Sequence, residues 1–134
     1  MTQGLVIVVA DDDLLFSTRI ASAVSACGHH AHLVRTADAL REALRTRPAA
    51  VILNLASSRL EAVSAIREAR MDPLSRAVPL LGFCGHADTP RRAAALQAGC
   101  NRVVTNGEIS SRLPRLLDEV LAIAAPAPPS DRNV

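Results

Sequence analysis

The sequence contains no lysine, tryptophan or tyrosine, and its only aromatic side chains are Phe16 and Phe83. Because bases and sugars stack on large aromatic side chains, their scarcity argues against binding to single-stranded nucleic acid. The positive charge comes from 15 arginines that are spread along the chain, whereas proteins that bind a phosphate backbone concentrate this charge on one face. We therefore expect no nucleic-acid partner.

Features of secreted or membrane proteins are also missing. The cysteines Cys27, Cys84 and Cys100 are odd in number and follow no metal-finger spacing, so we expect reduced, mostly buried thiols. The first apolar run is short, lacks a basic leader and is followed at once by acidic residues, unlike a signal peptide. No run is long enough to span a bilayer. These absences predict a cytoplasmic protein with no membrane partner.

What is present is a regular alternation of two patterns. Short apolar runs predict strands at 5–10, 30–34, 50–55, 78–83 and 102–105. Amphipathic spacing predicts helices at 14–27, 37–45, 60–70, 89–97 and 109–124, with Leu15 and Ile20 on the buried face of the first. Strands and helices that alternate in this way predict an α/β fold with a doubly wound, five-stranded parallel sheet. We expect one domain over residues 1–124 and a flexible, Pro-rich tail over 125–134.

Polar residues follow four of the predicted strands. They are Asp11–Asp13, the loop from Asn54 to Ser57, the loop from Cys84 to His86, and Thr105-Asn106. In a doubly wound sheet, ligands bind beyond the carboxyl ends of the strands. The topology therefore predicts that these four loops lie close together and form the functional end of the molecule.

Three segments carry a resemblance to a known family: the strand end Val9–Asp13, the strand and loop Pro79–His86, and the turn Ala98–Asn101. Over roughly residues 4–124 the chain resembles a receiver domain of two-component signalling. The resemblance implies a flavodoxin-like (βα)₅ fold. It also implies transfer of a phosphoryl group from a histidine kinase to an aspartate that ends the third strand. Two acids after the first strand would hold Mg²⁺, and a Ser/Thr and a Lys after the fourth and fifth strands would bind the phosphoryl group.

The sequence departs from this pattern at four positions. Asn54 stands at the phosphoacceptor position, and an amide cannot form an acyl phosphate. Cys84 replaces the Ser/Thr, and its sulfur forms weaker hydrogen bonds. Val103 replaces the aromatic switch residue, and Asn106 replaces the lysine, which no shift of register restores in a chain without lysine. The resemblance therefore indicates an atypical receiver, a pseudo-receiver, that is not phosphorylated on aspartate.

The acidic cluster and the altered pocket leave several interpretations open. Asp11, Asp12 and Asp13 are either a residual acidic patch or a weak Mg²⁺ site in which Asp12 is the ligand; we expect no other cofactor. Alternatively, the neutral pocket formed by Asn54, Cys84 and Asn106 would bind an uncharged small ligand. The Asp-x-Asp pattern is also found in haloacid-dehalogenase-type phosphatases, but their lysine, late acidic pair and cap domain are not evident here, so we expect no enzyme activity.

One surface is predicted to contact other proteins. Receivers dimerise or dock through the face formed by the fourth helix, fifth strand and last helix, which here carries Arg91, Arg92, Asn101, Arg102, Ser110 and Arg112. The resemblance thus predicts a protein partner, such as a signalling kinase, an output protein or a second copy of the chain. The cluster of His29, His30 and His32 is expected to be ordinary surface.

Overall fold

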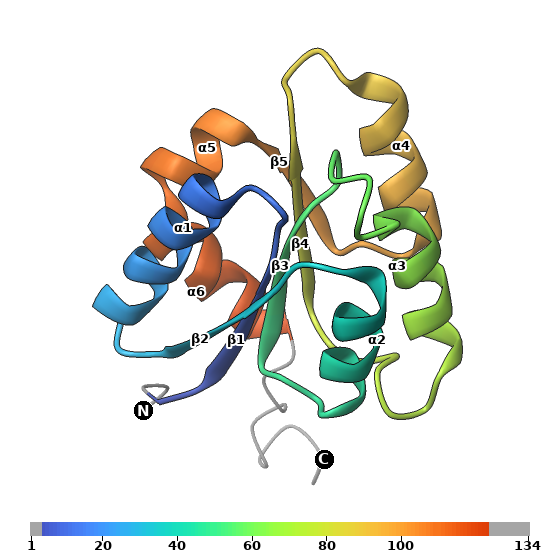
Figure 1. Ribbon diagram of the computed structural model, residues 1–134, viewed down its shortest axis with the longest axis horizontal. Helices are drawn as coiled ribbons and strands as arrows, with labels where there is room; N and C mark the ends of the chain where they lie inside the picture. Colours follow the sequence, from blue (N-terminus) through green and yellow to red (C-terminus); the bar gives the residue numbers. More distant parts are fainter. Residues whose placement is uncertain (1–3, 124–134) are drawn as a thin grey trace, which may run out of the picture.

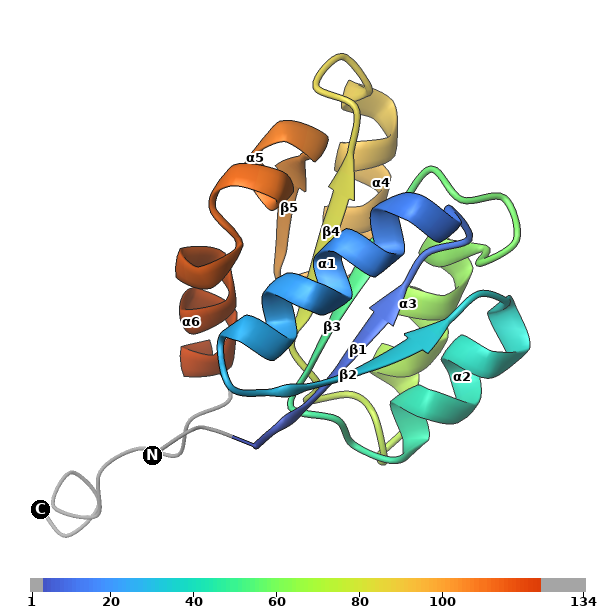
Figure 2. The ribbon, with the colours of Figure 1, turned by 60° about the vertical axis from the view of Figure 1, so that its left-hand side comes forward.

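The computed structural model describes residues 4–123, which form one parallel sheet between two layers of helices (Figures 1 and 2). The strands are β1 (Val6–Ala10), β2 (His30–Val34), β3 (Ala50–Asn54), β4 (Leu80–Cys84) and β5 (Arg102–Thr105). The helices are α1 (Leu14–Ala26), α2 (Ala37–Arg45), α3 (Ala62–Met71), α4 (Thr89–Ala98), α5 (Asn106–Ser111) and α6 (Leu113–Ile123). The strand order is β2-β1-β3-β4-β5, which confirms the predicted fold class.

Each face of the sheet supports its own apolar core. Along β3, Val51 and Leu53 pack with α2, α3 and α4, whereas Ala50 and Ile52 pack with α1, α5 and α6. Both faces of the central strands are therefore buried, which explains why they read as continuous apolar runs instead of alternating ones. Full burial of a Val, Leu or Ile side chain stabilises a fold by roughly 1.5–3 kcal/mol, so these two cores hold the strand ends in place.

The last predicted helix is wrong in one respect: it is two helices. Thr105 and Glu108 form a reciprocal capping box that begins α5 at Asn106, before the predicted start. The chain then leaves helical geometry at Arg112, with a φ of −128°. Pro114, in the first turn of α6, has no N–H to continue a hydrogen-bonded helix from α5. All other predicted elements appear within two residues of their predicted bounds.

Asp88 is the N-cap of α4 and accepts a hydrogen bond from the Arg91 backbone N–H. Two single-residue expectations are wrong. His29 is 6% exposed, and its Nδ1 accepts a hydrogen bond from the Leu5 backbone N–H at 3.3 Å. Leu15 is 68% exposed instead of buried. Spacing along a helix does not show where the neighbouring helix ends, and α5 and α6 leave the first turn of α1 uncovered.

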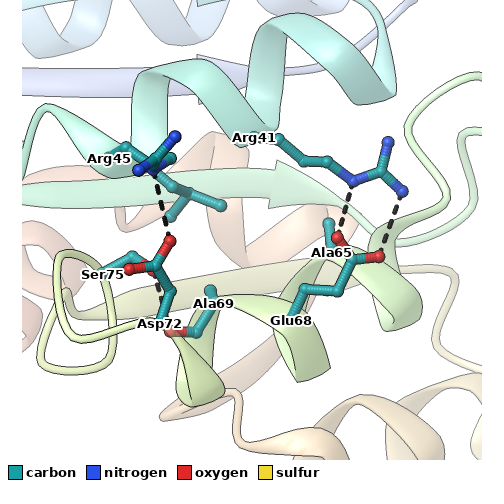
Figure 3. Close-up of a pocket in the computed structure, with 8 residues that line it drawn as sticks. Arg41, Arg45, Ala65, Glu68, Ala69, Asp72 and Ser75 are labelled. Atoms are coloured by element: carbon teal, nitrogen blue, oxygen red, sulfur yellow. Dashed lines mark hydrogen bonds and ion pairs between the residues drawn. The ribbon is translucent and has the colours of Figure 1, made fainter.

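Ion pairs of Arg41 and Arg45 connect α2 to α3 and its ends, and two of them are drawn in Figure 3. The Arg41 guanidinium makes a bidentate contact with Glu68, at 2.8 and 3.2 Å, and Arg45 Nε lies 3.3 Å from Asp72. They span a hollow of about 250 Å³ whose floor includes Leu44. Because both arginines already have acidic partners, this hollow is a helix contact and not a ready binding site.

Within residues 4–123, no helix is long and apolar enough to cross a membrane. The predicted tail, residues 125–134, lies outside the described residues.

Candidate functional site

The structure brings the predicted loop clusters together at the carboxyl edge of the sheet. Ala10 pairs with Leu53 on β3, so that Asp11 follows β1 beside the end of β3. Asn54 pairs with Phe83 on β4, and Cys84 pairs with Thr105 on β5. The strands thus end in register, and the loops that follow them form one polar end of the molecule (Figure 2).

The three consecutive aspartates have different environments. Asp11 is fully buried, and its Oδ1 accepts hydrogen bonds from the Asp13 backbone N–H and from Asn54 Nδ2, both at 3.0 Å. Asp13 is exposed and caps α1, accepting from the Phe16 backbone N–H at 2.9 Å. Asp12 is partly exposed. The predicted acidic pocket is therefore one buried carboxylate, one helix cap and one half-exposed acid.

The Asn54 side chain is held in one orientation. Its Oδ1 accepts a hydrogen bond from the Ala56 backbone N–H at 2.9 Å, which requires an oxygen at that position. The amide nitrogen must therefore point toward Asp11, to which it donates. The N–H groups of Asn54 and Asp13 thus satisfy Asp11 Oδ1 without a cation.

A Mg²⁺ ion of the kind that the family resemblance implies does not fit this arrangement well. The buried Oδ2 of Asp11 has no hydrogen-bond partner among residues 4–123, and a cation would satisfy it. However, Mg²⁺ requires oxygen ligands in near-octahedral geometry, and Asn54 presents an N–H group beside Asp11. The remaining oxygens do not make the carboxylate-rich set that the family uses. A weak site at Asp12 stays a prediction.

Cys84 and Val103, which stand where the family resemblance implies a Ser/Thr and an aromatic residue, are both buried core residues. Burial raises the pKa of the Cys84 thiol, and the nearby Asp88 carboxylate raises it further. Its Sγ lies 4.0 Å from the Asp88 carbonyl oxygen, a long and weak contact. Val103 is 3% exposed and packs in the core on the α2, α3 and α4 side of the sheet. Neither side chain offers a charged or strong hydrogen-bonding group to the pocket.

Asn106 is exposed and is the first residue of α5. The polar groups beside it are already engaged: Thr105 accepts from the Glu108 N–H at 3.1 Å, and Glu108 accepts from the Thr105 N–H at 2.9 Å. The backbone hydrogen bond from Thr105 lowers the pKa of the Glu108 carboxyl. The end of β5 is therefore committed to starting a helix.

The residues of the predicted interaction face do not all form one surface. Arg91 and Arg92 are exposed on α4, and Arg102, also exposed, begins the neighbouring strand β5. Ser110 instead lines a hollow of about 210 Å³ beside α1, where Phe16 lies. Arg112 is exposed between α5 and α6.

Asn101 is occupied by a structural network that the sequence did not indicate. Its Oδ1 accepts from the Leu80 backbone N–H at 2.7 Å and from Arg70 Nη2 at 2.8 Å. Arg70, half-buried on α3, also donates to the carbonyl oxygens of Gly99 and Val78, at 2.9 and 2.8 Å. A fourth bond reaches the carbonyl of the exposed Arg76. These bonds tie α3 to the turn before β5, at the end of the sheet opposite the polar loops.

Comparisons with known proteins agree with this fold. No family model matches the sequence, and no curated protein matches it. Solved structures do. The receiver domain of a sensor histidine kinase from Pseudomonas aeruginosa, solved with a magnesium ion in its active-site cleft, is 24% identical, with a TM-score of 0.80 over 89% of this chain and 98% of that one. The chemotaxis response regulator CheY4 of Vibrio cholerae is 13% identical, with a TM-score of 0.78 over 88% and 99%.

A longer protein also contains this fold. NtrX from Brucella abortus is 21% identical, with a TM-score of 0.80 over 91% of this chain but only 28% of its own length. The chain therefore matches solved receivers that are single domains and a receiver-like part of a larger protein. Its architecture is the receiver-domain fold of two-component systems.

Proposed function

We propose that this chain is a receiver-type signalling domain that is not phosphorylated on aspartate and that acts through contact with another protein. The observation that carries the proposal is Asn54. It stands at the end of β3, and its amide is fixed between Ala56 and the buried Asp11. An amide in this position does not attack a phosphoryl group, and it occupies the space beside Asp11.

The surroundings of Asn54 support the same conclusion. Receiver-type chemistry needs a carboxylate to accept the phosphoryl group and a nearby cation to stabilise the charge that develops on its oxygens. Here Cys84 is buried, Asn106 is a neutral side chain, and the whole chain has no lysine. We therefore propose that the domain is not an enzyme and keeps one resting conformation at this end.

An exposed apolar patch supports the proposed protein contact. Leu14 and Leu15, in the first turn of α1, are 67% and 68% exposed. Further along α1, Phe16 and Ile20 line the hollow shared with α5. Adjacent exposed leucines beside an apolar hollow are typical of surfaces that bind other proteins. This patch is more apolar than the arginine-rich surface of α4.

The direct test is incubation of the protein with acetyl phosphate and Mg²⁺, followed by intact-mass measurement. We expect no mass increase of about 80 Da, the mass that a phosphoryl group adds in receiver-type transfer. The sensor kinase receiver from Pseudomonas aeruginosa, treated in parallel, controls for reagent quality. An alkali-labile adduct that is mapped to an aspartate of this chain would contradict the proposal. An acid-stable adduct on serine would be consistent with the proposal, because it would not show phosphorylation of an aspartate.

A further inference from the structure

A third hollow lies beside the pocket of Asn54, Cys84 and Asn106, and its lining does not include Asn54. It has a volume of about 350 Å³ and is lined by residues of the β3–α3 loop, the first turn of α3 and the first turn of α4. We call it the α3 hollow. Its lining includes Ser57 and Ser58 from the loop, Ala62 to Ser64 from α3, and Arg91 from α4.

Helix α3 presents unpaired backbone donors at this hollow. Its N-cap, Glu61, has a left-handed backbone with a φ of 48° and makes no side-chain cap. Within residues 4–123, the backbone N–H groups of Ala62, Val63 and Ser64 have no hydrogen-bond acceptor. The first N–H groups of a helix carry the positive end of its dipole. The start of this ten-residue helix therefore favours a negatively charged group.

Ser57 provides an independent indication of a ligand. It is 7% exposed, and its Oγ is buried without a hydrogen-bond partner in the part of the chain that the structure describes. Leaving a buried hydroxyl unpaired costs about 1–3 kcal/mol. Ser57 lines the α3 hollow, so a change of its χ1 rotamer would let the hydroxyl donate to an occupant with acceptor oxygens and remove this cost.

Arg91 adds a positive charge on the opposite wall. Its Nη1 pairs with the Asp88 carboxylate, but a guanidinium has five N–H donors, so donors remain for a second anion. One acid, Glu61, also lines the hollow; its Oε1 lies 3.5 Å from Arg41 Nη2, on the α2 side of α3. The hydroxyls of Ser58 and Ser64 are exposed at the rim.

We propose that the α3 hollow binds a small tetrahedral oxyanion, either free phosphate or the phosphate group of a small metabolite. The N–H groups at the start of α3 and the Ser57 hydroxyl would hold its oxygens, and the Arg91 guanidinium would neutralise its charge. This binding is non-covalent and does not involve Asn54. The proposal therefore does not depend on whether the chain is phosphorylated on aspartate.

The test is a titration of the ¹⁵N-labelled protein with sodium phosphate, at ionic strength kept constant with sodium chloride and without acetyl phosphate. We expect saturable shifts of the amide signals of Ser57 and of Ala62 to Ser64, with a millimolar or tighter Kd. Arg91→Ala should weaken binding about tenfold, which corresponds to about 1.4 kcal/mol. Arg92→Ala removes the same charge from the next residue of α4, which does not line the hollow, and should change Kd less than twofold.

Ser57→Ala tests the buried hydroxyl and should weaken binding severalfold without lowering the unfolding temperature, because the hydroxyl has no partner in the free protein. A parallel titration with glycerol 3-phosphate separates the two sources of phosphate. Tighter binding of the ester identifies a metabolite, and equal binding identifies the free ion. Absence of saturable shifts at these amides, or equal weakening by Arg91→Ala and Arg92→Ala, would overturn the proposal, leaving a water-filled hollow or nonspecific ion binding.

Discussion

Replacing Asn54 with aspartate is expected to replace its hydrogen bond to Asp11 with repulsion between two carboxylates. In the native chain Asn54 Nδ2 donates to the buried Asp11 Oδ1 at 3.0 Å. Asn54→Asp replaces this donor with a second carboxylate, whose charge would lie about 4 Å from the first. Two like charges at that separation repel by about 4 kcal/mol at an effective dielectric constant of about 20. Because residue 54 is partly exposed, solvent screens part of this repulsion, and we expect a net loss of about 3 kcal/mol.

Urea unfolding at pH 7 without divalent cations measures this loss. With a denaturant dependence of about 1.5 kcal/mol per molar, the midpoint should fall by about 2 M. Lowering the pH should reduce the difference, because the folded pair would take up a proton more readily than the unfolded chain does. Adding Mg²⁺ at ten times its Kd should restore about 1.4 kcal/mol to the variant and almost nothing to the native protein.

Two variants separate repulsion from other effects. Asn106→Asp makes the same change at an exposed position and should alter stability by no more than about 0.5 kcal/mol. Asn54→Ala removes the hydrogen bond without adding charge, so the decrease in the free energy of unfolding that it causes should not depend on Mg²⁺. If Asn54→Asp is as stable as the native protein at pH 7, or if Mg²⁺ stabilises both equally, the proposed contact between positions 54 and 11 is incorrect.

Three further predictions concern other parts of the molecule. Arg70→Met should lower the free energy of unfolding by about 2–4 kcal/mol, because two partly buried backbone carbonyls lose their donor. Arg67→Met, at an exposed position of the same helix, controls for the loss of charge, and equal effects of the two variants in urea unfolding would refute the role of Arg70. Alkylation by iodoacetamide at pH 8, mapped by mass spectrometry, should modify the partly exposed Cys27 before the buried Cys84, whose raised pKa leaves less thiolate; faster reaction of Cys84 would contradict this. The pKa of the Glu108 carboxyl is lowered in the folded state, so the native protein should be more stable than Glu108→Gln above the ordinary carboxyl pKa of 4.5. This difference in stability should disappear as the pH falls below that value. A difference that persists at pH 2 in urea unfolding would count against an ionic contribution of Glu108.

The strands, the helices and the fold class could be predicted from the sequence, because they depend on the spacing of apolar residues along the chain. Central strands such as β3 are buried on both faces, so they appear as apolar runs of strand length, and right-handed connections leave only a handful of topologies open. The family resemblance selects the flavodoxin-like topology among them, and this topology places Asn54 beside Asp11. The neighbourhood of the candidate site was therefore predictable from the strand ends together with the resemblance.

Contacts that depend on side-chain orientation were not predictable. No sequence pattern shows that the Asn54 nitrogen faces Asp11, because this depends on a hydrogen bond from the Ala56 backbone. Asn101 resembled a surface residue, yet an arginine from α3 engages it. The unpaired hydroxyl of Ser57 follows from how the β3–α3 loop closes on the start of α3. Such details arise from packing between segments that are distant in the sequence.

The position of Arg70 over Gly99 has a consequence for how this sequence can evolve. Gly99 has a φ of +119°, and a Cβ added there would lie 2.6 Å from Arg70 Cγ. A larger residue at position 99 would therefore displace the arginine and break its hydrogen bonds to the turn. The two positions are separated by 29 residues, but substitutions at them are coupled. Because the φ of Gly99 also strains any side chain there, we expect related sequences with an arginine at position 70 to keep glycine at position 99.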